Sequence, residues 1–210
     1  DDLIGLSEGS TVKSSGNMVY LALRPLLLDF VLSMPRGAAV VYPKDAAAIV
    51  GLADIFPGCV VVEAGVGSGA LSCSLLRAIG EHGYLYSFER REDFAAIAKK
   101  NVTNFFGAQP NNWQVTLGDL QDKVTALPVA SVDRIVLDML APWECVDIAA
   151  RSLRPGGVFL AYVATTTQLS ATAEALKEDG RFTEPESSET IVRGWHHEGL
   201  AVRPQQRMIG

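Results

Sequence analysis

Three alternate glycines, Gly65, Gly67 and Gly69, stand in EAGVGSGALS between an apolar run and a segment with helical periodicity. Glycine at these places allows a tight turn and lets a ligand approach the main chain and the start of a helix. Read with Ala70 as the last position, the same residues fit the G-x-G-x-x-[GA] pattern of dinucleotide-binding loops. The loop therefore predicts a nucleotide-type ligand without choosing among ligands, and a tight turn with no ligand remains an alternative.

Three acids follow at the ends of later apolar runs: Glu89, Asp119 and Asp138. Glu89 comes about 20 residues after the loop, where a carboxylate can accept both ribose hydroxyls of NAD or S-adenosylmethionine (SAM). Asp119 is placed to meet an adenine edge. Asp138 closes VDRIVLD, where a carboxylate is costly to bury unless it is paired or faces a cleft. Each acid alone can be a solvated loop residue or a helix cap. Three acids at successive strand ends suit SAM, because SAM has no pyrophosphate and its adenine, ribose and amino acid would lie across these strand ends.

The composition bounds the class of protein. With 210 residues, 48% of them apolar and 20% charged, the chain can bury one large α/β core. The net charge of −6 argues against a general polyanion binder. No apolar run approaches the ~20 residues of a membrane span, so no membrane partner is expected. The three cysteines, widely spaced in apolar contexts, read as buried thiols in a reducing cytoplasm.

We expect no metal site. His196 and His197 are adjacent on a predicted strand, so their side chains point to opposite faces and cannot easily ligate one ion. His82 stands alone in a loop with no cysteine nearby. No cysteine follows Pro142 directly, and this argues against C5-cytosine methylation, which needs a thiolate nucleophile.

Alternating strand-like and helix-like segments must position these residues. Strands are predicted at 59–65, 84–89, 113–119, 132–138 and 156–164, with helices at 71–80, 91–107, 142–153 and 170–179. Such alternation predicts an α/β fold, a Rossmann-like, doubly wound and mostly parallel sheet whose ligands sit at the carboxyl ends of the strands. TIVRGWHHEGLAVRP predicts two terminal strands around a turn, and an antiparallel terminal strand favours a methyltransferase.

The first 50 residues differ from the rest. We expect a helix at about 21–32, a strand-like VVY at 40–42, and a helix with Asp45 near its start. We therefore divide the chain into a lead-in segment, 1–50, packed on a SAM-binding catalytic domain, 51–210.

Four stretches carry a specific resemblance: MPRGAAVVYPKDAA, VVEAGVGSGALS, LDMLAPWE and the late GW pair. They resemble the tRNA (adenine-58-N1)-methyltransferase family in its bacterial and archaeal homotetrameric form, over nearly the whole chain. The resemblance implies a class I SAM-dependent methyltransferase fold, SAM as cofactor, tRNA as partner and a cytoplasmic homotetramer. DDLIG resembles the point where the family's small N-terminal β domain ends, and MIG resembles a last strand cut short, so we expect a fragment of a longer protein.

The resemblance also implies roles for residues. Asp138 would accept a hydrogen bond from the exocyclic amine of the target adenine, and Tyr42 would lie beside that base as a second catalytic residue. Gln168 would lie near the substrate pocket. From its position after Pro142, Trp143 could form a wall of that pocket or belong to the core. The expected SAM-binding set is Gly65, Gly67, Ser68, Gly69, Ala70, Leu71, Glu89, Asp119 and Asp138.

Other functions remain open from the sequence. A methyltransferase for protein carboxylates or small molecules would share the glycine loop and Glu89, an NAD-dependent oxidoreductase would share the loop, and a degenerate RNA-binding partner subunit would be non-enzymatic. The cationic residues Arg36, Lys44, Arg193, Arg203 and Arg207 fall in segments that the fold would place around the cleft mouth, where they could contact tRNA. The same residues are also compatible with an ordinary solvated surface.

Overall fold

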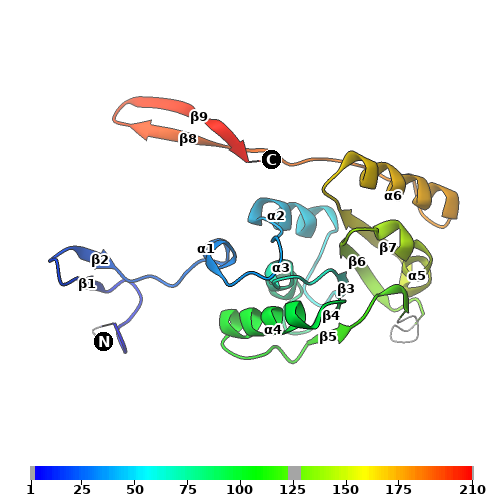
Figure 1. The fold of residues 1–210 in the computed structure, drawn as a ribbon, viewed down its shortest axis with the longest axis horizontal. Coiled ribbons are helices and arrows are strands. Elements are labelled where there is room, and N and C mark those ends of the chain that lie inside the picture. Colours follow the sequence, from blue (N-terminus) through cyan, green and yellow to red (C-terminus); the bar gives the residue numbers. More distant parts are fainter. Residues whose placement is uncertain (1–2, 123–128, 210) are drawn as a thin grey trace.

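A five-stranded parallel sheet forms the centre of the molecule (Figure 1). The computed structural model describes residues 3–122 and 129–209. Its strands are β3 (Val60–Ala64), β4 (Tyr84–Glu89), β5 (Trp113–Leu117), β6 (Val132–Asp138) and β7 (Leu153–Tyr162), in the order β5-β4-β3-β6-β7. The chain order reverses beside β3, which pairs with β4 on one side and β6 on the other. In such sheets ligands bind at the carboxyl ends of the strands flanking this reversal.

Helices cover both faces of the sheet. On one face α2 (Pro43–Leu52), α3 (Ala70–Ile79) and α4 (Glu92–Phe106) pack against Val61 and Val136. On the other face the 3-10 helix η2 (Pro142–Cys145) and α5 (Val146–Ser152) pack against Val62 and Ile135. Helix α6 (Thr166–Asp179) contacts η2 and α5. Because neighbouring strand residues point to opposite faces, apolar runs such as VVV supply both cores. The predicted doubly wound α/β fold is confirmed.

Two hairpins lie outside this body. The first is formed by β1 (Thr11–Lys13) and β2 (Val19–Leu21), and the second by β8 (Val192–Glu198) and β9 (Ala201–Ile209). Figure 1 shows both projecting from the sheet and its helices. The predicted antiparallel pair is present at the end of the chain, but it forms its own two-stranded sheet, and the five-stranded sheet stays wholly parallel.

The lead-in segment differs from its predicted structure. The helix expected at 21–32 is shorter, because Leu21 pairs with Thr11 in the first hairpin and α1 spans only Leu27–Ser33. Pro25 disfavours a helical Arg24, which explains the late start. The stretch 40–42 is not a strand, since it pairs with no described strand, and Tyr42 is instead the N-cap of α2. The helix predicted at 142–153 is divided into η2 and α5, and β7 begins at Leu153.

Three further features bear on the class of protein. Cys59, Cys73 and Cys145 are free and buried, as predicted. His196 and His197 are both exposed. Within residues 3–122 and 129–209, the helices lack the length and apolar content that crossing a bilayer requires.

We expect Ile135→Ala to lower the free energy of unfolding by about 2–5 kcal/mol, because Ile135 is fully buried in the interior strand β6 and the substitution leaves a cavity. Leu200→Ala is the control, since Leu200 is fully exposed at the tip of the second hairpin. Chemical denaturation measures both variants. Equal stability of the two would contradict the placement of Ile135 in the core.

Candidate active site

The glycine loop brings three strand ends into contact. The Gly65 N–H donates to the carbonyl of Phe88 at 3.0 Å, which joins the end of β3 to the end of β4. Gly65 has φ +88°, and a Cβ added there would lie 1.7 Å from the main-chain oxygen of Asp138 at the end of β6. A side chain at this position is therefore excluded, and the absence of one lets the tips of β3 and β6 meet.

Ser68 fastens the same loop to the lead-in segment. Its buried hydroxyl accepts hydrogen bonds from the N–H groups of Gly37 (3.1 Å) and Ala38 (3.3 Å). The amide of Asn101 on α4 donates to the carbonyls of Ser68 (2.9 Å) and Pro35 (2.8 Å). The Ser68 side chain thus faces the protein, so any contact with a cofactor would come through its main chain. Sequence reasoning missed Asn101, whose only signal is a polar residue at a buried helix position.

Glu89 supports the loop from the end of β4. One carboxylate oxygen accepts the Gly67 N–H at 2.9 Å, and the other accepts the Arg91 N–H, also at 2.9 Å. Its side chain is almost fully buried at 6% exposure. A carboxylate has about four lone-pair sites, so two stay available for ligand hydroxyls. The glycine loop and the predicted ribose-binding acid, Glu89, are therefore joined directly by a hydrogen bond.

Asp138 stands at the carboxyl end of β6 with its side chain half-buried. Among the described residues none donates a hydrogen bond to its carboxylate. Burial, and secondarily the charge of Glu89, raise the pKa of Asp138 to about 6. Because a desolvated carboxylate without a partner is unfavourable, this geometry indicates a group kept for a ligand.

Glu63 is a third acid in this cluster, and the sequence analysis missed it. It is fully buried in β3, and its Oε2 accepts hydrogen bonds from Ser72 and Ser87, both at 2.7 Å. Burial, and to a smaller extent the charges of Asp138 and Glu89, raise its pKa to about 7, against the lowering effect of the two hydroxyls. An acid inside the apolar run VVVEAG was the available signal.

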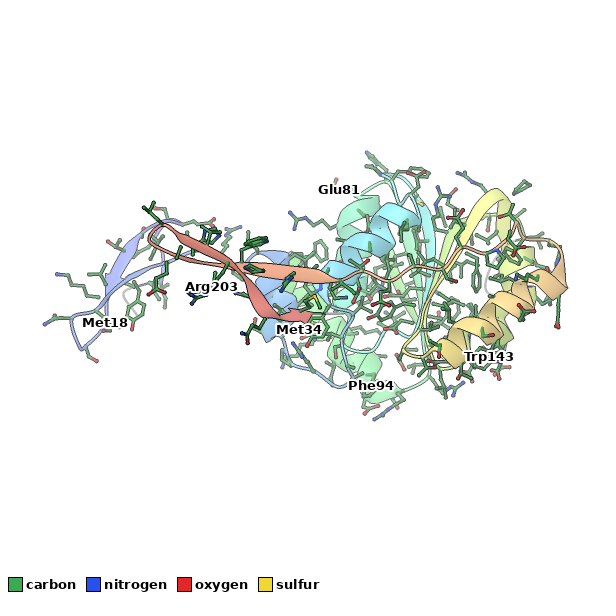
Figure 2. All side chains as sticks on the ribbon, turned by 90° about the horizontal axis from the view of Figure 1, so that it is seen from above. Met18, Met34, Glu81, Phe94, Trp143 and Arg203 are labelled. Atoms are coloured by element: carbon green, nitrogen blue, oxygen red, sulfur yellow. The ribbon has the colours of Figure 1, made fainter. Side chains whose placement is uncertain are left out.

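The three acids share one side of the sheet. Glu63 and Asp138 come two residues after Val61 and Val136, which pack on the α3 face. Glu89 and Asp138 are the last residues of β4 and β6. In Figure 2, Glu81, which precedes β4, is on one side of the body, and Phe94 and Trp143, which follow β4 and β6, are on the other. The carboxyl edge therefore carries a concentration of negative charge suited to a cationic ligand.

The remaining residues predicted to bind cofactor lie after the end of β5 and at the start of α3. Asp119 accepts a hydrogen bond from Nε of Arg90 at 2.5 Å, so its carboxylate is already ion-paired, and its contact with an adenine stays a prediction. Ala70 and Leu71 are buried in the first turn of α3, where their main-chain N–H groups face the loop end of the helix. Gly69 caps this helix with φ +80°.

Tyr42, Trp143 and Gln168 occupy three different elements. Tyr42 precedes α2 with 43% of its surface exposed, and Trp143 lies half-buried in η2. The side-chain oxygen of Gln168 caps α6 by accepting the Thr165 N–H at 3.1 Å, while its amide donates to the Leu140 carbonyl at 2.9 Å. Gln168 therefore holds the loop that follows Asp138. Pocket roles for all three stay predictions.

The predicted cationic cluster is only partly available for RNA. Lys44 is occupied by Asp45 and by the Thr190 carbonyl, with 11% of its side chain exposed. Arg36 donates to the Leu32 carbonyl. Arg193 and Arg203 are exposed on the second hairpin, where Arg193 donates to the Gln205 carbonyl at 3.1 Å and Figure 2 shows Arg203. The Arg207 side chain lies outside the described part of the structure.

A groove of about 390 Å³ lies elsewhere, between α1, α2 and α3. It is lined by apolar residues that include Leu27, Val31, Pro43 and Val50, and by none of the predicted site residues. Size alone would place a ligand there. We place the site at the strand ends because the glycine loop and the titratable groups converge there.

The strand order, the glycine loop at the reversal and the acid closing the next strand define a class I, Rossmann-like methyltransferase fold. Within this class the chain belongs to the family described as tRNA methyltransferase complex GCD14 subunit, whose model matches residues 18–206.

Three similar proteins place the chain more closely. It is 41% identical over 146 residues to the tRNA (adenine(58)-N(1))-methyltransferase TrmI of Thermus thermophilus, covering 70% of this chain and 56% of that protein. It is 31% identical to the tRNA (adenine(57)-N(1)/adenine(58)-N(1))-methyltransferase TrmI of Methanocaldococcus jannaschii, covering 100% of this chain and 81% of that protein. A crystal structure of a SAM-dependent O-methyltransferase from Thermotoga maritima superposes with a TM-score of 0.90 at 29% identity, covering 99% of this chain and 76% of that one. The chain thus spans little more than half the length of its Thermus relative.

We expect Gly65→Ala to destabilise the protein far more than Gly58→Ala. Both glycines have positive φ, so both variants lose about 1–2 kcal/mol to backbone strain. A Cβ at Gly58 meets nothing within 4 Å, whereas one at Gly65 collides with the Asp138 carbonyl. Denaturant unfolding gives the stability loss of each variant, and the difference between the two losses is the cost of the collision at position 65. Equal losses would show that the tips of β3 and β6 do not depend on their close approach.

Proposed function

We propose that this chain is the catalytic part of a SAM-dependent methyltransferase that modifies N1 of adenine at position 58 of tRNA. The family and the curated relatives support the reaction class. The observation that carries the proposal is the Asp138 carboxylate, which is half-buried, unpaired among the described residues and adjacent to the glycine loop through Gly65.

The strand ends fit SAM as cofactor. The glycine loop ends at the start of α3, where main-chain N–H groups can bind a ligand, and Glu89 keeps lone pairs for ribose hydroxyls. Glu63, Glu89 and Asp138 provide negative potential, which complements the sulfonium and amino groups of SAM. When bound, SAM supplies an electrophilic methyl group.

Asp138 performs its proposed role as a hydrogen-bond acceptor. Methyl transfer to a ring nitrogen is an in-line displacement, so alignment and charge placement provide most of the catalysis. The ionised carboxylate accepts a hydrogen bond from the exocyclic amine, which orients the ring. As the base becomes cationic, the same carboxylate stabilises the developing charge. The exposed ring of Tyr42 is available to stack on the base.

We further propose, on the sequence resemblance, that the protein acts in the cytoplasm as a homotetramer. Arg203, exposed on the second hairpin, would contact phosphates, and Arg193, which also donates to the Gln205 carbonyl at 3.1 Å, is a second candidate on that hairpin.

The reaction is tested by incubating the protein with SAM and unmodified tRNA transcripts and mapping methylated nucleosides by mass spectrometry. We expect 1-methyladenine at position 58, and no product from a transcript with guanine at that position. Calorimetry should show binding of SAM but not of NADH. Binding of NADH instead would favour the oxidoreductase, and binding of SAM without tRNA methylation would favour a carboxylate or small-molecule acceptor.

For Asp138 we expect a pH-dependent role. The carboxylate must be ionised to accept the hydrogen bond, and its pKa of about 6 means that kcat/KM for tRNA rises between pH 5 and 7 and then levels off. Asp138→Asn should lower kcat on the order of 100-fold and abolish this acidic limb, with SAM affinity less affected. Glu81→Gln, at the opposite edge of the sheet, is the control and should leave the profile unchanged. Wild-type turnover in Asp138→Asn would remove this residue from catalysis.

A further inference from the structure

A group of three hydrogen-bonded side chains, centred on a buried carboxylate, lies next to the proposed base site. Asp45, in the first turn of α2, is 8% exposed. One of its oxygens accepts from the Lys44 ammonium at 2.7 Å, and the other accepts from the Tyr162 hydroxyl at 3.0 Å. We call Lys44, Asp45 and Tyr162 the Asp45 clasp. Each carboxylate oxygen has its own donor, so the orientation of the Asp45 side chain is determined.

One end of the clasp lies beside Asp138. Tyr162 is the last residue of β7 and is the direct register partner of Asp138 on β6. Burial raises the pKa of Tyr162 to about 12, with further contributions from Asp45 and from the charge of Asp138. The Tyr162 hydroxyl therefore stays protonated as a donor to Asp45, and it is close enough to respond to the Asp138 carboxylate.

The other end of the clasp holds Tyr42. The N–H of Asp45 donates to the Tyr42 carbonyl at 2.9 Å, because Tyr42 is the N-cap of the same helix. Fixing the Asp45 side chain to β7 consequently fixes the start of α2, and with it Tyr42. The clasp thus joins the element carrying Tyr42 to the strand end beside Asp138.

Lys44 adds a third segment. Its ammonium also donates to the main-chain carbonyl of Thr190 at 2.9 Å. Thr190 lies two residues before the second hairpin begins at Val192. The chain leading into the hairpin is thereby attached to the same buried carboxylate.

A buried ion pair is a weak source of stability, because desolvation of both charges offsets their attraction. The contribution of the Lys44–Asp45 pair and its Tyr162 hydrogen bond is geometric, because together they fix the arrangement of α2, β7 and residue 190. We propose that Lys44, Asp45 and Tyr162 are positioning residues for methyl transfer, which set the separation of Tyr42 from Asp138 and couple it to the segment entering the second hairpin. This inference rests on the proposed function.

The clearest test is Tyr162→Phe, which removes one hydroxyl and keeps the ring. We expect kcat for tRNA methylation to fall on the order of 10- to 100-fold, as displacement of an aligned group does, with SAM affinity and KM for tRNA within about twofold of wild type. Tyr84→Phe is the matched control, since Tyr84 is a half-buried tyrosine at the amino end of β4, away from the strand ends that carry the site. It should retain wild-type kcat. All assays are run well below the unfolding temperature of each variant.

Conservative substitution separates positioning from general damage. Asn at position 45 can still accept from Tyr162, so Asp45→Asn should retain more kcat than Asp45→Ala. Lys44→Met should increase hydrogen exchange in residues 185–191, because it releases Thr190. That readout needs neither SAM nor tRNA.

The outcomes distinguish this inference from the proposed function. Wild-type kcat in Tyr162→Phe, in a protein that methylates tRNA, would overturn the clasp and leave the function standing. A parallel loss of SAM binding and kcat would also overturn it, since that result indicates damage to the whole site. A wild-type chain that binds SAM but leaves tRNA unmethylated would overturn both.

Discussion

The contact between Gly65 and the Asp138 main chain is the constraint on which the site depends. It is possible only because position 65 has no side chain and adopts a positive φ, and it puts the loop after β3 directly against the end of β6. The hydrogen bond from Gly65 to Phe88 draws in β4 as well. Three strands that are adjacent in the sheet are thus also joined at their ends, so a ligand on the loop must lie near Asp138.

Electrostatics gives this junction its chemical character. Burial raises the pKa of Glu63 and of Asp138, and the charge of Glu89 raises both further, as does that of Asp138 for Glu63. Structural acids are normally neutralised by cations, as Asp119 is by Arg90 at the rim. At the strand ends the balance is left negative. A cationic methyl donor would neutralise this charge, and the cationic base formed in the proposed reaction would be stabilised by the same field.

Much of the fold was predictable because it is encoded locally. Apolar runs punctuated by glycine and proline predicted the β/α alternation, and the acids at strand ends follow from topology once the sheet is parallel. The features that the sequence did not predict depend on contacts between distant parts of the chain. The pairing of Leu21 with Thr11 and the separation of the second hairpin depend on contacts that no single segment specifies. Glu63 and Asn101 were missed because their burial appears only when β3 and α4 are packed, and Lys44 looked like a surface cation until its partners were known.

The attachment of Ser68 to Gly37 and Ala38 means that the shape of the binding loop is determined partly by residues about thirty positions upstream. The lead-in segment is thus a structural support of the glycine loop, although the sequence analysis separated it from the catalytic domain. A boundary drawn at residue 50 would cut the hydrogen bonds of Ser68 and of Asn101 to Pro35. Any shortened version of the protein that is meant to preserve the loop must therefore begin upstream of Pro35.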